Sequence, residues 1–228
     1  MKHGKRYKKA AQLANRSKHY PLEEAVKIVK QSGTAKFDES IDVAVRLGVD
    51  PRQADQIVRG TVALPHGIGK SVRVLVITKT QEVAAKEAGA DMVGFDEYLT
   101  KIKEGWTDTD VIVATPEVMG DLGKLGKILG PRGLMPNPKS GTVTQNVGPT
   151  VKEIKGGKIE FRTDKTGILH AMIGKASFPE EKILENARTF LHIIMKMKPT
   201  SAKGQYVKSV TISTTMGPGI RIDRAEVV

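Results

Sequence analysis

The residues best suited to chemistry in this chain are hydroxyl side chains, lysines and glycines gathered in three short segments. These segments are Lys36 to Ser40 (KFDES), Asp164 to Gly167 (DKTG) and Ser213 to Pro218 (STTMGP). Such residues suit RNA, because its 2′-hydroxyl groups donate and accept hydrogen bonds and its bases and riboses contact apolar side chains. A reader of DNA would favour a helix rich in Arg, Asn and Gln. The three segments therefore predict contact with a folded RNA.

A second candidate is the glycine-rich stretch Met119 to Gly141, in which Asp121 is the only acid. It holds six glycines, three prolines and four cations, namely Lys124, Lys127, Arg132 and Lys139. Glycines let a backbone approach a phosphate chain closely, and the cations neutralise that chain. The pattern predicts an anion-binding surface loop, with a merely flexible loop as the alternative.

Nucleotide chemistry has weaker support in the sequence. The run Gly67 to Ser71 (GIGKS) is similar to the end of a phosphate-binding P-loop, but the required first glycine would fall at Leu64. An apolar strand-like run follows it, whereas the mechanism needs a helix N-terminus. The DKTG run matches the phosphorylated-aspartate motif of cation-pumping ATPases, yet a hairpin turn fits it better. No G-x-G-x-x-G follows the first strand of the central segment.

Catalytic and metal-binding patterns are also missing. The five histidines show neither H-E-x-x-H nor ligand spacing: His3, His19, His66, His170 and His192. Two carboxylate pairs stand in the first turns of predicted helices, where they complement the helix dipole. We therefore predict no enzymatic activity, no catalytic residue, no metal site and no cofactor.

Composition limits the class of protein. The 228 residues include 37 Lys and Arg against 25 Asp and Glu, a net charge of +12 that calls for a polyanionic partner. With 39% hydrophobic residues the chain has enough apolar surface for packed cores. Zero Cys and no long apolar run predict a soluble, cytoplasmic protein. The charge alone leaves a nonspecific DNA-coating protein as an alternative.

The distribution of charge and the hydrophobic periodicity together divide the chain into three parts. Residues 1–19 hold seven Lys and Arg and no acid, whereas residues 70–118 hold six bases and nine acids. From residue 72, apolar strand-like runs alternate with helical stretches, which predicts a small parallel sheet flanked by helices. Both ends of the chain instead show amphipathic helices and alternating strands, including a predicted hairpin of strands 158–163 and 167–173.

The first 67 residues hold too little apolar surface for a separate core, so they are expected to fold together with the C-terminal segment. The predicted fold class is α/β and α+β in two domains. Residues 1–67 with 158–228 form a split, two-layer α+β domain that binds RNA, and residues 68–157 form an inserted, Rossmann-like α/β domain.

Several longer runs of this chain resemble one known family. The runs are GTAKFDES, DQIVRGTVALPHGIGK, ATPEVMGDLGKLGKILGPRGLMPNPKSGTV, IEFRTDKTG, GKASF and SVTISTTMGPGIRI. They closely resemble the bacterial ribosomal protein L1 family, the first protein of the large subunit, over nearly the whole chain.

The resemblance implies the partners as well as the two-domain fold. Similar proteins bind a three-way junction of large-subunit (23S) rRNA and form the mobile stalk that accompanies deacylated tRNA out of the E site. They also repress translation of their own operon by binding its mRNA leader. The resemblance implies a constituent of the large ribosomal subunit, monomeric when free, with no membrane partner.

The resemblance also implies which residues contact RNA. Lys36 meets phosphate and Phe37 packs on a ribose or base, while Asp164 and Thr166 bond ribose hydroxyls beside Lys165. The full predicted set is Lys36, Phe37, Ser40, Asp164, Lys165, Thr166, Gly167, Ser209, Thr215, Met216 and Gly217. A secondary contact with rRNA or tRNA is expected at Lys124, Lys127, Arg132 and Lys139.

Overall fold

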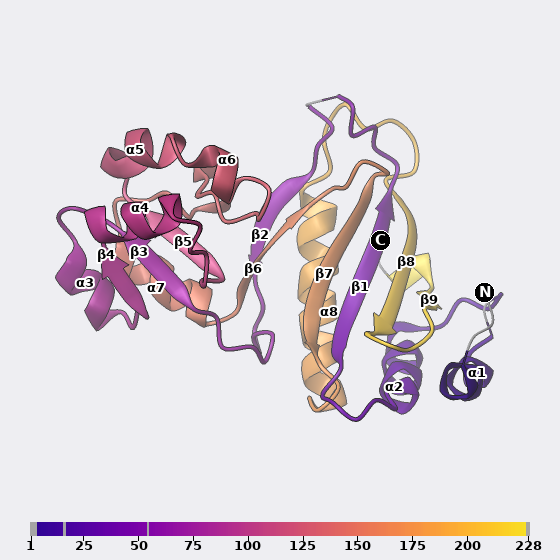
Figure 1. Cartoon of the computed structure of the whole chain (residues 1–228). Helices are drawn as coiled ribbons and strands as arrows, with labels where there is room; N and C mark the ends of the chain where they lie inside the picture. The colour runs from indigo at the N-terminus through magenta and orange to yellow at the C-terminus, as the bar shows by residue number, and fades with distance from the viewer. Residues whose placement is uncertain (1–3, 16, 54, 227–228) are drawn as a thin grey trace. The chain divides into compact units, whose positions relative to one another are not determined.

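The chain forms two compact units, shown in Figure 1 as a computed structural model that describes residues 4–15, 17–53 and 55–226. Unit 1 is built from residues 1–69 and 159–228, and unit 2 from residues 70–158. The expected insertion at 68–157 differs from unit 2 by two residues at one end and one at the other.

Unit 1 is organised around an antiparallel sheet of four strands in the order β7-β1-β8-β9. Its strands are β1 (Ser40–Leu47), β7 (Ile168–Lys175), β8 (Val207–Thr214) and β9 (Ile220–Ile222). The helices α2 (Leu22–Ser32) and α8 (Glu180–Lys196) contact β8 and β7, respectively. Figure 1 shows α8 running behind β7 and β1.

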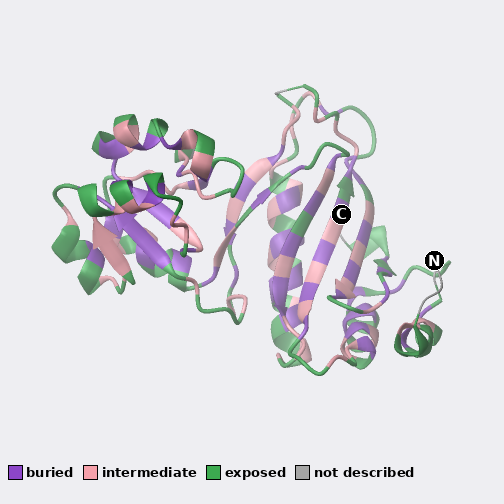
Figure 2. Cartoon of the chain, viewed as in Figure 1, coloured by how far each residue is buried: buried purple, intermediate pink, exposed green. Residues whose placement is uncertain are grey.

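One face of this sheet is buried and the other is open. Ile41, Val43 and Val45 of β1 are at most 1% exposed and share a core with Val26 of α2 and Phe190 of α8. The intervening residues point to the opposite face, because successive side chains of a strand alternate between faces. Figure 2 shows this alternation as bands along β1 and β7. The helix-free side of the four-stranded sheet is called the open face below.

Unit 1 also contains a second, two-stranded sheet that corrects the predicted hairpin. Its strands are β2 (Arg59–Ala63) and β6 (Lys158–Arg162). β6 pairs with β2 and β7 pairs with β1, so the two consecutive strands do not form a hairpin. The prediction was wrong because it favoured pairing of neighbours in sequence over pairing with strands about a hundred residues away. The helix α1 (Lys5–Gln12) and the 3-10 turn η3 (Arg224–Glu226) complete the unit.

Unit 2 is a parallel sheet covered on both faces, as the sequence predicted. Its strands are β3 (Val74–Ile77), β4 (Met92–Gly94) and β5 (Val111–Ala114), in the order β4-β3-β5. Leu75 and Ile77 face a core shared with helix α4 (Asp96–Lys103). Val74 and Val76 face a second core shared with α3 (Glu82–Glu87) and α7 (Val147–Lys155). This double coverage explains the continuous apolar run of β3.

The glycine-rich stretch of unit 2 is partly helical rather than a surface loop. It contains α5 (Met119–Gly123), α6 (Gly126–Leu129) and η2 (Pro138–Ser140), and η1 (Pro116–Val118) directly precedes it. Leu122, Leu125 and Leu129 are at most 4% exposed and join the α4 core. The loop prediction gave more weight to the glycines than to the leucines, whose burial fixes the local helices. In the described part of the chain, no helix has the length and apolar character needed to cross a membrane.

Candidate nucleic-acid interface

The predicted RNA-contacting residues of unit 1 gather at opposite ends of the four-stranded sheet. Ser40 begins β1 and Thr215 follows β8, and the two strands are antiparallel, so these residues lie at one end. Gly167 precedes β7 at the other end, where its carbonyl accepts a hydrogen bond from the Leu47 backbone at 2.9 Å. An eight-residue strand separates the ends by about 23 Å. The predicted set is therefore spread along the sheet.

The Met216 cluster, at the first end, consists of Lys36, Phe37, Ser40, Thr215, Met216 and Gly217. The Thr215 N–H donates to the Ser40 carbonyl, and the Ser40 N–H donates to Thr215 Oγ1, both at 3.0 Å. Lys36 is exposed, Phe37 is 56% exposed and Met216 is 50% exposed. Two large apolar side chains left in water beside a lysine are available to a ligand with flat apolar surfaces.

A buried carboxylate joins the two loops of this cluster. Glu39 is only 2% exposed, and its oxygens accept the backbone N–H groups of Ala35 at 2.8 Å and Met216 at 2.9 Å. Burial raises the pKa of Glu39, but these hydrogen bonds outweigh burial and hold the pKa below its ordinary value. Asp38 next to it accepts the N–H and Oγ–H of Ser177 at 3.1 and 2.9 Å. The two acids of KFDES therefore position the loop.

Gly217 allows the close packing beneath this cluster. A Cβ atom at this position would lie 2.4 Å from Thr214 Oγ1, closer than real Cβ contacts allow, and 3.0 Å from Ser32 Oγ, which is a tight contact. Ser32 is itself fixed by a 2.7 Å hydrogen bond to the Val29 carbonyl. Any side chain at 217 would therefore push the Thr215–Met216 loop away from α2.

The Asp164 turn, residues 164–167, forms the opposite end. Asp164 Oδ1 accepts the backbone N–H groups of Thr166 and Ile168 at 2.8 Å, and the Thr166 hydroxyl donates to the same carboxylate. The Ile168 and Thr166 hydrogen bonds lower the pKa of Asp164. Gly167 has φ +77°, a conformation that glycine adopts readily. The Asp164 and Thr166 side chains thus stabilise the turn, and Lys165 remains exposed on it.

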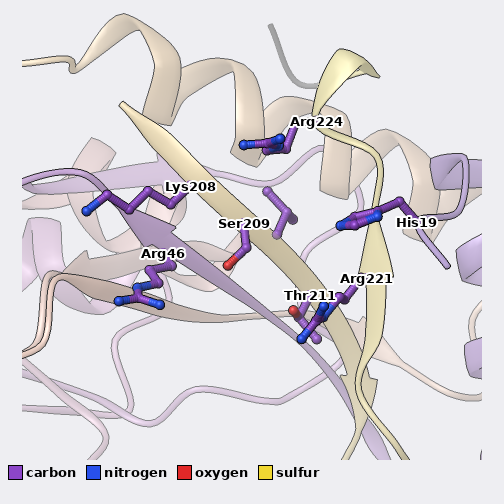
Figure 3. A pocket seen from close by; sticks show the side chains of 8 residues that line it. His19, Arg46, Lys208, Ser209, Thr211, Arg221 and Arg224 are labelled. Atoms are coloured by element: carbon purple, nitrogen blue, oxygen red, sulfur yellow. The ribbon is translucent and has the colours of Figure 1, made fainter. Parts of the chain in front are cut away.

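Ser209 lies between the two ends, on the open face, where the structure reveals bases that the sequence analysis missed. It lines a hollow of about 390 Å³ together with His19, Arg46, Lys208, Thr211, Arg221 and Arg224. Figure 3 shows the basic side chains arranged around Ser209. The alternation of residues 41–47 places Arg46 on the solvent face, but only strand pairing unites it with the others.

The four residues of the predicted secondary contact belong to unit 2, and they differ in whether they form ion pairs. Lys124 forms an ion pair with Asp121 at 3.0 Å, and this pairing lowers the pKa of Asp121. Lys127 and Arg132 are exposed and form no ion pair with a described residue. Lys139 lies in η2, and its side chain is outside the described part of the structure.

Comparison with known proteins agrees with the motifs. The profile of the ribosomal protein L1p/L10e family matches residues 28–218. The chain belongs to this family. It is 59% identical over 226 residues to the large ribosomal subunit protein uL1 of Chlorobium luteolum, covering 99% of each chain. It is 60% and 59% identical over 220 residues to the uL1 proteins of Chlorobium chlorochromatii and Flavobacterium psychrophilum, covering 96% of each chain.

The L1p/L10e family consists of ribosomal proteins, in agreement with the prediction of a protein that is not an enzyme. The P-loop-like run also lacks the geometry of a phosphate cradle, because β3 follows it and Lys70 Nζ lies 2.7 Å from Asp110 Oδ1. Among the described residues no three His, Asp or Glu side chains are grouped as metal ligands, and His3 lies outside them.

Proposed function

We propose that this L1p/L10e family member is a cytoplasmic constituent of the large ribosomal subunit that binds large-subunit rRNA through unit 1. Its relatives are named as proteins of that subunit. Unit 1 contains 24 Lys and Arg against 14 Asp and Glu, a net charge of +10, whereas unit 2 has 13 against 11. The attraction for a polyanion therefore resides almost entirely in unit 1.

The observation that carries the proposal is the Met216 cluster. Two loops about 180 residues apart in sequence are fixed together by Glu39 and by the Ser40–Thr215 hydrogen bonds. They present a lysine beside two exposed apolar side chains, Phe37 and Met216. RNA offers the matching groups, because its riboses and splayed bases have apolar faces next to phosphates.

In this proposal most of the predicted residues have a distinct physical role. Lys36 and Lys165 neutralise phosphates, and Phe37 and Met216 contact a base or ribose. Gly217 lets the Thr215–Met216 loop pack closely on α2 and so positions it for the RNA, and Ser209 offers a hydroxyl from the open face. Because Asp164 and Thr166 are engaged with their own turn, they act mainly by holding Lys165 in place, with their free lone pairs left for ribose hydroxyls.

The finer function follows from the family resemblance. In this proposal the rRNA site is the three-way junction of the 23S stalk, the protein moves with the stalk as deacylated tRNA leaves the E site, and free protein is monomeric. The same surface binds the leader of the protein's own operon mRNA and represses its translation. Lys127 and Arg132 of unit 2 make secondary contacts with rRNA or tRNA.

The test is binding of the purified chain to three ligands of equal length across a salt series. The ligands are the stalk-junction fragment of large-subunit rRNA, the operon mRNA leader and a duplex DNA. We expect both RNAs to bind more tightly than DNA, the rRNA most tightly, with the preference persisting at high salt. Equal affinities that fall together as salt rises would identify a nonspecific basic protein and contradict the proposal.

A further inference from the structure

We propose that the hollow on the open face is a second RNA-binding subsite, which holds backbone phosphates of the RNA bound by the Met216 cluster. This inference rests on the proposed function and adds a site to it. The hollow is lined by His19, Arg46, Lys208, Arg221 and Arg224 around the hydroxyls of Ser209 and Thr211, and no acid lines it. None of these bases was among the residues predicted from the sequence.

Strand pairing builds the hollow from separate parts of the chain. Arg46 of β1 is opposite Ser209 of β8, and Thr211 of β8 is opposite Arg221 of β9. Arg46 and Arg221 thus stand two strands apart, about 10 Å across the sheet, with two hydroxyls between them. The register shifts between Arg46 and Leu47, which leaves Lys208 as an extra residue of β8. Such a bulge can redirect a side chain, and Lys208 also lines the hollow.

The bases of the hollow are available because no acid neutralises them. Within the described residues, none of Arg46, Lys208, Arg221 and Arg224 forms an ion pair. Two acids lie next to them in sequence, but Asp223 accepts the Ala225 N–H at 3.1 Å and Glu226 accepts the Leu22 N–H at 2.6 Å. Neither carboxylate forms an ion pair with a described base, so the guanidinium groups remain for a ligand.

Phosphate is the anion that best fits this arrangement. Guanidinium groups bind phosphate oxygens with paired N–H donors, and serine and threonine hydroxyls add neutral hydrogen bonds. A second hollow shares Lys208 and is lined also by Lys203 and by the Gly48–Asp50 segment, which includes the acid Asp50. That segment contacts the Asp164 turn, since a Cβ on Gly167 would lie 3.2 Å from the Val49 carbonyl. Lys208 and Lys203 therefore extend the basic surface towards the Asp164 turn, with Asp50 the one acid in the lining of the second hollow, which favours an extended RNA backbone over a small phosphate compound.

The experiment compares Arg46→Gln/Arg221→Gln with a control, Lys182→Gln/Lys196→Gln, which removes the same charge from exposed positions of α8. Affinity for the stalk-junction rRNA fragment is measured from 0.05 to 0.3 M salt in the full chain. We expect the first variant to bind on the order of tenfold more weakly at 0.1 M salt. The slope of log K against log salt should become shallower by about 1.5, and the control should change affinity less than twofold.

Phosphate-ethylation interference locates the contact on the RNA. We expect one group of phosphates whose ethylation weakens the wild-type complex and has no further effect on the Arg46/Arg221 variant. Equal melting temperatures of the two variants would show that folding is retained, and Arg224→Gln, outside the sheet strands, should give a smaller loss of the same kind. Tripolyphosphate is the probe for a free phosphate compound.

Three results would overturn the inference in distinguishable ways. If the Arg46/Arg221 variant keeps the affinity and salt slope of the wild type while Thr215→Ala/Met216→Ala weakens binding, the subsite is excluded and the proposed function stays intact. If tripolyphosphate raises the melting temperature of the wild type but not of the Arg46/Arg221 variant, and the variant binds RNA with unchanged affinity, the hollow is assigned to a free phosphate compound. Failure of the wild-type chain to prefer the rRNA fragment over DNA would reject the proposed function itself.

Discussion

The open face of unit 1 and the surface of unit 2 use lysine and arginine in different ways. In unit 2, Lys70 pairs with Asp110, Lys155 with Asp91 and Lys158 with Glu153, at 2.7 to 3.0 Å. Arg73 likewise pairs with Asp108, and Lys101 with Glu97. The bases around the open-face hollow have no such partner among the described residues. Among the described residues, these five bases of unit 2 are therefore already paired with acids, whereas the bases of the hollow are free to meet phosphate.

Two glycine substitutions, one in each unit, test most sharply whether RNA binding resides in unit 1. Gly217→Ala should raise the Kd for the rRNA fragment on the order of 100-fold and lower the free energy of unfolding by about 1–3 kcal/mol, because its Cβ would collide with Thr214. Gly120→Ala in α5 is the matched control, since a Cβ there meets no atom within 4 Å. It should leave RNA binding unchanged and change stability by at most about 1 kcal/mol. Binding titrations and chemical denaturation check both, and equal losses in both variants would contradict the assignment.

Glu39→Gln tests whether RNA binding by unit 1 depends on the carboxylate that joins the two loops of the Met216 cluster. One N–H of Ala35 or Met216 would face the amide NH₂ instead of an oxygen, so unfolding free energy should fall by about 1–3 kcal/mol and RNA affinity on the order of tenfold. Because folding lowers the pKa of Glu39, the stability that it contributes is present above its unfolded pKa of about 4.3 and is lost as pH falls through the folded pKa. The difference between wild type and variant should therefore shrink from pH 6 towards pH 3, as followed by urea denaturation.

Glu181→Gln, at an exposed position in the first turn of α8, is the control for Glu39. It should change stability by less than about 1 kcal/mol and leave RNA affinity unaltered. A Glu39→Gln protein with normal affinity at pH 7 would show that the two loops keep their positions without the carboxylate.

The smallest effect is expected in unit 2. Lys127→Glu/Arg132→Glu should weaken binding of the isolated rRNA fragment less than about threefold, because unit 2 supplies only +2 of the net charge. Thr215→Ala/Met216→Ala in the same titration should cost more, on the order of 1–3 kcal/mol of binding free energy for each truncated side chain. The division of labour between the units would be wrong if both double variants weakened binding equally.

Sequence patterns predicted the parts of the fold that depend on local burial. The continuous apolar run of β3 indicated a strand covered on both faces, and the alternation of β1 indicated one open face. The hairpin prediction failed because the choice of partner for β6 depends on β2, far away in sequence. In α5 and α6, by contrast, the local sequence was sufficient: the spacing of the leucines is typical of a helix, but the glycines between them favoured the prediction of a loop.

The candidate site was predictable to the extent that its residues form contiguous motifs. KFDES and STTMGP are such motifs, and the family resemblance supplied their roles. The bases of the hollow could not be found in this way, because they come from distant parts of the chain: Arg46 from β1, Lys208 from β8, and Arg221 and Arg224 from the C-terminal end. Only the register of β1, β8 and β9 brings them together.

The place of β1 in the middle of its sheet has a consequence for synthesis of the protein. Both of its neighbours, β7 and β8, are translated later, and 159 residues separate the end of β1 from the start of β8. At roughly 5–20 residues per second, ribosomes take roughly 8–30 s to make that stretch. Unit 2 is contiguous and can fold during this delay, while β1 waits with both edges unpaired. The proposed RNA-binding surface is therefore completed only late in translation.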